Sequence, residues 1–203
     1  MNRVALTFDD GPAVWTSEVL DILSGHGARA TFFVIGSLVE DRAELVRRMV
    51  SGGHEIGNHS WSHPRLASAC DDERVRGELA RTSDLISSIC GAPPLRFRAP
   101  YHDVDARVLS IAADLGLRHT RGDVTPPDWD PRCTATYVAA FVLQQARPGT
   151  VIGLHDGVPP KKVGSAATQQ ATVDAVRMFV PRLKDRGVEC VTASTLLDEA
   201  APP

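Results

Sequence analysis

Two neighbouring carboxylates, Asp9 and Asp10, follow a short apolar run near the start of the chain, in the segment Thr-Phe-Asp-Asp-Gly-Pro. Like charges this close raise each other's pKa unless a positive group lies beside them. A metal ion that binds one carboxylate and leaves the other as a base would resolve the conflict. His59 and His63 are four residues apart, and on one helical turn both rings would point the same way. The pattern predicts an open catalytic zinc site with three protein ligands and water; two polar loop histidines are the alternative.

Arg98 follows another strand-like run, in the segment Arg-Ala-Pro-Tyr. A guanidinium can bind a carboxylate through two hydrogen bonds and hold it ionised, and Asp9 is the expected recipient. The turn at Pro100 and Tyr101 can aim a backbone N–H into the site, and His102 beside it could touch a substrate. A surface arginine next to a proline turn is the alternative.

His155 directly follows the apolar run at 151–154, and Asp156 follows it. A histidine at a strand end can act as a general acid because its pKa lies near neutrality. Asp128 could orient the His155 ring, and Trp129 could form a wall of the pocket. A carboxylate that caps a loop is the alternative for Asp128.

Other hydrolase patterns are absent from the sequence. No Gly-x-Ser-x-Gly is present, and no Gly-rich phosphate loop opens a helix. His54-Glu55 begins a zincin-like pattern, but the second histidine, His59, is one position too far on. We therefore interpret His54 as structural.

Strand-like and helical patterns alternate along the chain, which favours parallel strands joined by right-handed crossovers. About seven such units predict an α/β fold, a distorted (β/α) barrel in one domain over residues 1–203. The carboxyl ends of the strands share one face of such a barrel, so the polar residues above should converge. Thr16 or Ser17 is the expected cap of the first helix, and Pro181 should kink or split the last long one. We expect strands at 4–8, 30–35, 54–57, 95–98, 117–120, 150–154 and 188–192, and helices at 18–24, 43–50, 71–90, 105–115, 134–146 and 169–184.

Composition narrows the class of protein. The net charge of −3 gives no electrostatic reason to expect a nucleic acid partner. The sequence contains no run of about 18 apolar residues, so we expect no membrane span. No signal-like start precedes the first strand, and we therefore expect a cytoplasmic protein. The four cysteines lie far apart and are expected to be buried free thiols.

Taken together, these segments resemble the five motifs of the NodB-type polysaccharide deacetylases, carbohydrate esterase family 4. They occur in the family's order between Thr7 and Asp156. The resemblance implies a distorted (β/α) barrel of fewer than eight complete units. It implies Asp9 as general base, His155 as general acid, and metal ligation by Asp10, His59 and His63.

The resemblance further implies that Arg98 positions Asp9, that Asp128 positions His155, and that the Tyr101 N–H helps to hold an oxyanion. Two motifs depart from the family pattern. Ala99 and His102 replace a proline and a glycine of the third motif, and Asp123 and Asp128 of the fourth motif lie further apart than usual. These departures concern the substrate-binding pocket and the role of Asp128 rather than the metal site.

The implied reaction is removal of an N-acetyl group from an N-acetylglucosamine moiety with Zn²⁺ or another divalent metal. A soluble glycoconjugate substrate is expected, and the sequence is also similar to deacetylases of glycopeptide-antibiotic assembly. A chitooligosaccharide or another N-acetylated sugar is the alternative substrate. A catalytically silent sugar-binding module is the alternative of another class. The segment 156–168 has no apolar period, and we expect it to form a lid over the acceptor, with Lys161 and Lys162 near the substrate.

Overall fold

In the computed structural model, which describes residues 2–160 and 168–199, every predicted strand is present and all strand pairs are parallel. The strands are β1 (Arg3–Gly11), β2 (Thr31–Val34), β3 (Glu55–Asn58), β4 (Arg96–Phe97), β5 (Arg118–His119), β6 (Val151–His155) and β7 (Glu189–Val191). They lie in the order β5-β4-β3-β2-β1-β6, and β7 pairs with the first residues of β1. β1 is therefore central. β6 lies along one side of it, and β7 and then β2 lie along the other, since Ala5 pairs with both Val151 of β6 and Val191 of β7.

The sheet curves into an almost closed barrel. After β5 the chain continues to Val124, which forms a single parallel bridge with Ile152 of β6. Gly153 N donates to Val124 O at 3.0 Å across the same gap. A short extended segment thus takes the place of a further strand, and the expected distorted barrel is confirmed.

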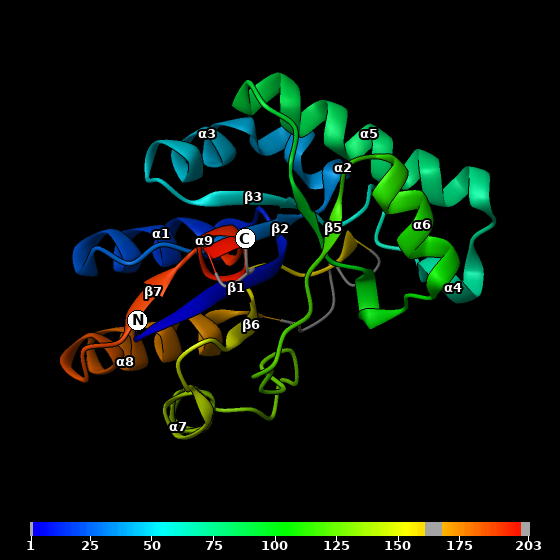
Figure 1. Cartoon of the computed structure of the whole chain (residues 1–203). Helices are drawn as coiled ribbons and strands as arrows, with labels where there is room; N and C mark the ends of the chain where they lie inside the picture. The colour runs from blue at the N-terminus through cyan, green and yellow to red at the C-terminus, as the bar shows by residue number, and fades with distance from the viewer. Residues whose placement is uncertain (1, 161–167, 200–203) are drawn as a thin grey trace.

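Helices cover the outside of the sheet (Figure 1). α8 packs against α1 and α7 on the side of β1 and β6, whereas α5 packs against α3 and α6 on the side of β3 to β5. The longer helices are α1 (Val14–His26), α3 (Ala43–Ser51), α5 (Asp72–Cys90), α6 (Ala106–Asp114), α7 (Ala135–Gln145), α8 (Gln170–Asp185) and α9 (Ala193–Glu199), and the short ones are α2 (Gly36–Val39), α4 (Leu66–Ala69) and the 3-10 turns at Glu40–Arg42 and Pro100–His102.

The structure differs from two expectations about helices: neither Thr16 nor Ser17 caps the first helix from outside, and the last long helix is not split at Pro181. α1 begins at Val14, so Thr16 lies inside its first turn and its hydroxyl accepts a hydrogen bond from Ala13 N at 2.8 Å instead of capping from outside. α8 runs unbroken through Pro181. Phe179, Val180 and Leu183 are buried around the proline, and this packing holds the helix together despite the missing N–H.

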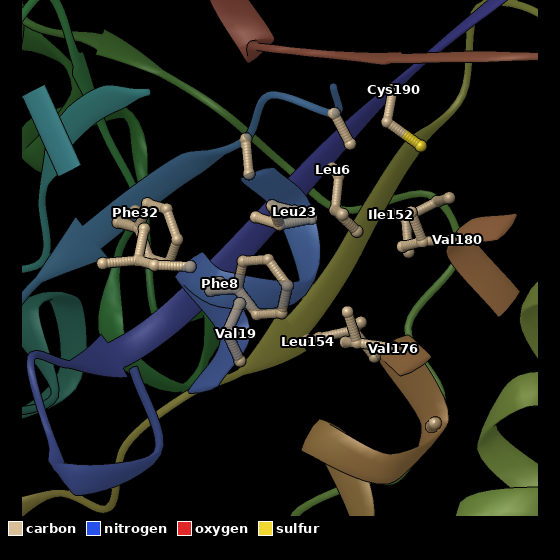
Figure 2. Packing of buried hydrophobic residues seen from close by; sticks show 14 of the residues in the cluster. Leu6, Phe8, Val19, Leu23, Phe32, Ile152, Leu154, Val176, Val180 and Cys190 are labelled. Carbon is tan, nitrogen blue, oxygen red and sulfur yellow. The ribbon is translucent and has the colours of Figure 1, made fainter. Parts of the chain in front are cut away.

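The main hydrophobic core lies between β1, β2 and β6 and the helices α1 and α8. Figure 2 shows Phe8 and Leu6 of β1 facing Val19 and Leu23 of α1, with Leu154 opposite Val176 of α8. Phe8 stacks on Phe32 with ring centroids 5.2 Å apart. Burial of such aromatic and aliphatic side chains, about 1.5–3 kcal/mol each, fixes the strand ends that carry the polar residues.

The cysteines are free, as expected, but only Cys190 is buried; Cys70, Cys90 and Cys133 are half-buried. Each of these three lies at or next to the end of a helix or in a loop, where the core covers one side of the chain only. No helix in the described ranges is both long and apolar enough to cross a membrane.

Candidate active site

A cavity of about 340 Å³ opens at the carboxyl ends of the strands. Eight of the ten residues that the sequence analysis assigned to the site line its wall: Asp9, Asp10, His59, His63, Tyr101, His102, Trp129 and His155. The other two, Arg98 and Asp128, lie behind the wall and are 1% and 2% exposed. The fold therefore brings together all of the predicted site residues; their roles remain predictions.

A β-bulge at Asp10 brings both carboxylates into the cavity. Side chains alternate along a strand, so two consecutive aspartates would ordinarily point to opposite faces. Between Asp9 and Gly11 the register of β1 against β2 shifts, and Asp10 has a φ of 71°. Aspartate tolerates this left-handed conformation better than most residues. The extra residue turns the Asp10 side chain to the same side as Asp9.

Asp10, His59 and His63 form a buried cluster whose ligand atoms all lie within 4.8 Å of one another. The Asp10 Oδ1 atom is 3.3 Å from His59 Nε2 and 3.0 Å from His63 Nε2, yet it makes no well-aligned hydrogen bond to a described residue. A buried carboxylate oxygen that faces two imidazole nitrogens suits a divalent cation. His59 Nδ1 contacts Arg98 O at 2.8 Å, which fixes the ring with Nε2 toward Asp10.

The protonation states also fit a metal site. Burial alone would raise the pKa of Asp10, but the contacts with His59 and His63 outweigh it and hold that pKa well below its usual range. Burial lowers the pKa of His63 despite the nearby Asp10 carboxylate. An ionised carboxylate and a neutral imidazole are the forms that bind metal.

The two histidines meet through a turn and not through a helix, so the helical geometry expected from their spacing is wrong. Ser60 and His63 have left-handed φ values of 63° and 58°. Asn58 Oδ1 accepts from Ser60 N at 2.8 Å at the start of the turn. Glu78 of α5 accepts from Ser62 N at 2.7 Å and from Ser62 Oγ at 2.6 Å. These bonds hold a strained backbone that the sequence pattern did not indicate.

Arg98 is buried beside Asp9, as the sequence predicted. Its Nη1 donates to Asp9 Oδ1 and to Thr7 Oγ1, both at 2.8 Å, and its Nε donates to Thr120 O at 3.0 Å. The guanidinium also lies over the Phe33 ring, 4.3 Å from its centroid. An arginine fixed from several sides can hold the Asp9 carboxylate in one orientation.

His155 and Asp128 form the second predicted pair. Asp128 Oδ1 is 2.7 Å from His155 Nδ1, and Asp128 Oδ2 accepts from His155 N at 2.8 Å. Burial alone would lower the pKa of His155, but the charge and hydrogen bond of Asp128 outweigh it and raise that pKa to about 10. The contact with Asp128 thus favours the protonated form of His155 and engages its Nδ1 atom.

Sequence reasoning missed two threonines that support these pairs. Thr172 of α8 donates to Asp128 Oδ2 at 2.9 Å, and Thr7 donates to Ile152 O at 2.7 Å. Asp156 is buried, and burial raises its pKa to about 7 while the Thr16 hydroxyl donates to its Oδ2. Thr7 lies in the first motif and could have been found there; Thr172 carries no sequence signal.

The outer wall of the cavity is aromatic. Tyr101 and Trp129 are 44% and 51% exposed, and the Trp129 ring lies 5.5 Å from the His155 ring in an edge-on arrangement. Tyr101 and His102 both have left-handed backbones, with φ values of 57° and 55°. Exposed aromatic rings beside polar groups suit the apolar faces of a sugar.

The structure also gives the positions of Asp123, of His54 and of part of the expected lid. Asp123, the other aspartate of the fourth motif, accepts from Val151 N at 2.8 Å at the start of β6 and lies outside the cavity wall. His54 accepts from Ala30 N at 3.1 Å, in keeping with a structural role. The expected lid falls partly on residues 161–167, with Lys161 and Lys162, which lie outside the described residues. On either side of them, Val158, Pro159 and Gln169 line the cavity.

The fold and the cluster define a parallel barrel with a candidate metal site at the carboxyl ends of its strands. The family model described as polysaccharide deacetylase matches residues 1–120. The chain therefore belongs to the polysaccharide deacetylase family.

Its relatives are similar over almost the whole chain. A chitooligosaccharide deacetylase of Sinorhizobium fredii is 43% identical over 188 residues, which are 91% of this chain and 86% of the relative. A peptidoglycan-N-acetylglucosamine deacetylase of Bacillus cereus is 34% identical over 195 residues, covering 96% and 68% of the two chains. Among solved structures, a family 4 acetyl xylan esterase of Clostridium thermocellum in complex with a cobalt ion is 38% identical with a TM-score of 0.86, covering 99% and 93%.

Proposed function

We propose that this chain is a metal-dependent hydrolase that removes the acetyl group from an N-acetylglucosamine residue of an oligosaccharide. One observation carries the proposal. Asp9 and His155 are register partners on the adjacent strands β1 and β6, and both line the cavity next to the cluster of Asp10, His59 and His63. A base and an acid thus flank one point beside a metal site, as amide hydrolysis requires.

The charge and the contacts of each residue suggest its step in the proposed reaction. Asp10, His59 and His63 would hold a divalent ion, which would supply a Lewis-acid charge to polarise the acetamide carbonyl and lower the pKa of water. Asp9, hydrogen-bonded to Arg98, takes the proton of the attacking water. The Tyr101 N–H stabilises the oxyanion, a contribution of about 3–4 kcal/mol for one such donor. His155, cationic through Asp128, gives its proton to the leaving amine, which otherwise departs poorly.

The relatives favour an oligosaccharide substrate. Chitooligosaccharide deacetylases and peptidoglycan deacetylases are among the proteins most similar to this chain. Chitooligosaccharide, the alternative substrate expected from the sequence, is therefore better supported than a glycopeptide-antibiotic intermediate. We propose zinc as the metal because two histidines and one carboxylate are a typical ligand set for it. The C. thermocellum esterase was solved with cobalt, so a relative binds another metal ion.

Acetate release from zinc-loaded protein tests the proposal. The substrates are tetra-N-acetylchitotetraose, free N-acetylglucosamine and an N-acetylglucosaminyl glycopeptide, each with a His59→Ala control. We expect the tetrasaccharide to have the highest kcat/KM and the control to be inactive. Absence of acetate from every substrate, with sugar binding retained, would instead support a silent sugar-binding module.

A further inference from the structure

A second hollow of about 350 Å³ adjoins the catalytic cavity. Its wall consists of His63, Pro64, Arg65, Ala69, Arg74 and Tyr101. His63, Arg65 and Tyr101 line the catalytic cavity as well, so the two hollows share one wall. A glycan that places its acetamide beside His63 can therefore extend into the second hollow.

Two guanidinium groups face this hollow. Arg65 lies just after the histidine turn, and Arg74 lies in the first turn of α5; both are exposed. Within the described residues, neither pairs with a carboxylate at 4.0 Å or less, and neither guanidinium donates a hydrogen bond. An unpaired pair of arginines in a concave surface is an electrostatic site for an anion.

The neighbouring carboxylates are occupied elsewhere. Asp103 accepts from Ala67 N and Ser68 N, both at 2.9 Å, and from Ser68 Oγ at 3.1 Å. Asp71 accepts from Arg74 N at 2.9 Å as the cap of α5. Asp72, in the same turn, forms an ion pair with Arg107 at 2.9 Å. Asp71, Asp72 and Asp103 are thus engaged with other groups, and of the three only Asp103 interacts electrostatically with Arg65.

The Tyr101 ring holds Arg65 in place. The Arg65 Cζ atom lies 4.5 Å from the Tyr101 ring centroid, and the His63 ring packs edge-on against the same ring at 4.7 Å. Tyr101 is thus held between a proposed metal ligand and Arg65. A guanidinium stacked by its face keeps the donors at its edge available for a planar acceptor such as a carboxylate.

We propose that Arg65 and Arg74 form a subsite for a carboxylate on the sugar next to the residue that is deacetylated. Such a subsite would favour an amino-sugar glycan with a carboxylate at that position over the same glycan without the charge. This inference rests on the proposed function, whose reaction it keeps and whose substrate it narrows.

The test compares two glycans that differ in one group. One is an oligosaccharide of alternating N-acetylglucosamine and N-acetylmuramic acid, and the other is the same glycan with its lactyl carboxylates converted to primary amides. We expect the zinc-loaded wild-type protein to favour the acid in kcat/KM by about tenfold at low salt, as for one charge-assisted hydrogen bond near a surface. Because exposed charges are screened, the preference should shrink with added salt.

Arg65→Gln should reduce the preference for the acid at least fivefold, mainly through KM, and Arg65→Gln with Arg74→Gln should abolish it. Arg182→Gln removes an equal charge from exposed surface on α8 and should leave the preference as in the wild type. Equal preference in wild type and Arg65→Gln would overturn the subsite while the deacetylase activity stands.

If neither glycan nor tetra-N-acetylchitotetraose releases acetate, the proposed function fails, and calorimetric binding of the two glycans then decides the subsite. Weaker binding of the acid alone in Arg65→Gln would support it. Equal binding of acid and amide by the wild type would overturn it.

Discussion

Asp9 and His155 each contact a buried partner of opposite charge. Arg98 lies 2.8 Å from Asp9, and Asp128 lies 2.7 Å from His155. The Asp128 partner raises the pKa of His155, and the Arg98 partner fixes the orientation of the Asp9 carboxylate. The two pairs suit the proposed roles of His155 as proton donor and Asp9 as proton acceptor.

Asp9→Asn should bind zinc with little change in affinity and lose activity by about 10²–10⁴ in kcat. Asparagine keeps the shape of the side chain but cannot accept the proton of water. Metal analysis of dialysed protein and acetate release measure the two quantities. Near wild-type kcat in the zinc-loaded variant would mean that another group is the base.

Asp128→Asn should move the alkaline limb of the pH profile to lower pH. His155 acts while protonated, so on the alkaline side kcat/KM should fall as the pH rises through its pKa of about 10. Without the Asp128 charge that pKa falls, and the limb should shift by at least about one unit. A Thr172→Val control removes one hydrogen bond to Asp128 and leaves its charge, so its limb should shift far less. Identical limbs in wild type and Asp128→Asn would contradict the pairing.

At the scale of elements, the end of β1 and the residues after β6 approach without room for a side chain. A Cβ atom on Gly157 would lie 2.0 Å from Asp10 O, and a Cβ atom on Gly11 would lie 2.5 Å from Asp156 Oδ2. The backbone that carries Asp10 is therefore held in place by the segment that follows His155.

Gly157→Ala should displace Asp10 and lower kcat/KM at least about tenfold, with a loss of about 1–3 kcal/mol in the free energy of unfolding. Gly25→Ala in α1 is the matched control, since its added Cβ meets nothing within 4 Å. That control should gain about 0.5–1 kcal/mol and keep full activity. Denaturant unfolding and acetate release give both values, and an active, stable Gly157→Ala protein would show that the two segments separate freely.

At the scale of the molecule, the proposed metal ligands come from two places far apart in the chain, the end of β1 and the turn after β3. A bound ion would link them directly. Binding to the folded state alone stabilises a protein by about 2.7 kcal/mol at a ligand concentration one hundred times Kd.

Zinc removal by a chelator should therefore lower Tm by about 5–10 °C in a protein of this size, and zinc should restore it. His59→Ala should not respond to zinc, whereas His26→Ala, at the end of α1, should respond as the wild type does. Differential scanning calorimetry measures the shift. A zinc-dependent Tm in His59→Ala would place the ion elsewhere.

Residues at strand ends were the most predictable part of the site. Apolar runs located β1, β4 and β6 within one or two residues, except that β1 extends to Gly11, and parallel strands bring their carboxyl ends together. The pairs Arg98–Asp9 and His155–Asp128 follow from that placement and opposite charge. The alternation of apolar runs with helical patterns also indicated the number of strands, because each buried strand requires a run of apolar residues.

Features set by the backbone or by tertiary packing were not predictable. No propensity reveals that Ser60 and His63 adopt left-handed φ values, since Glu78, which holds the turn, is 16 residues from Ser62. α8 stays continuous at Pro181 only because its neighbours bury it. Arg65 and Arg74 resemble ordinary surface charges until the fold places them on one wall.

The bulge at Asp10 bears on how such a site could be transplanted. Grafting the residue types of the first motif onto the end of another parallel strand would point one carboxylate into the new pocket and the other away from it. The recipient must also accommodate the uneven pairing in which Asp9 is opposite Phe33 and Gly11 is opposite Val34. The graft must therefore reproduce the backbone conformation of both strands, since copying the side chains alone would place only one of the two carboxylates in the pocket.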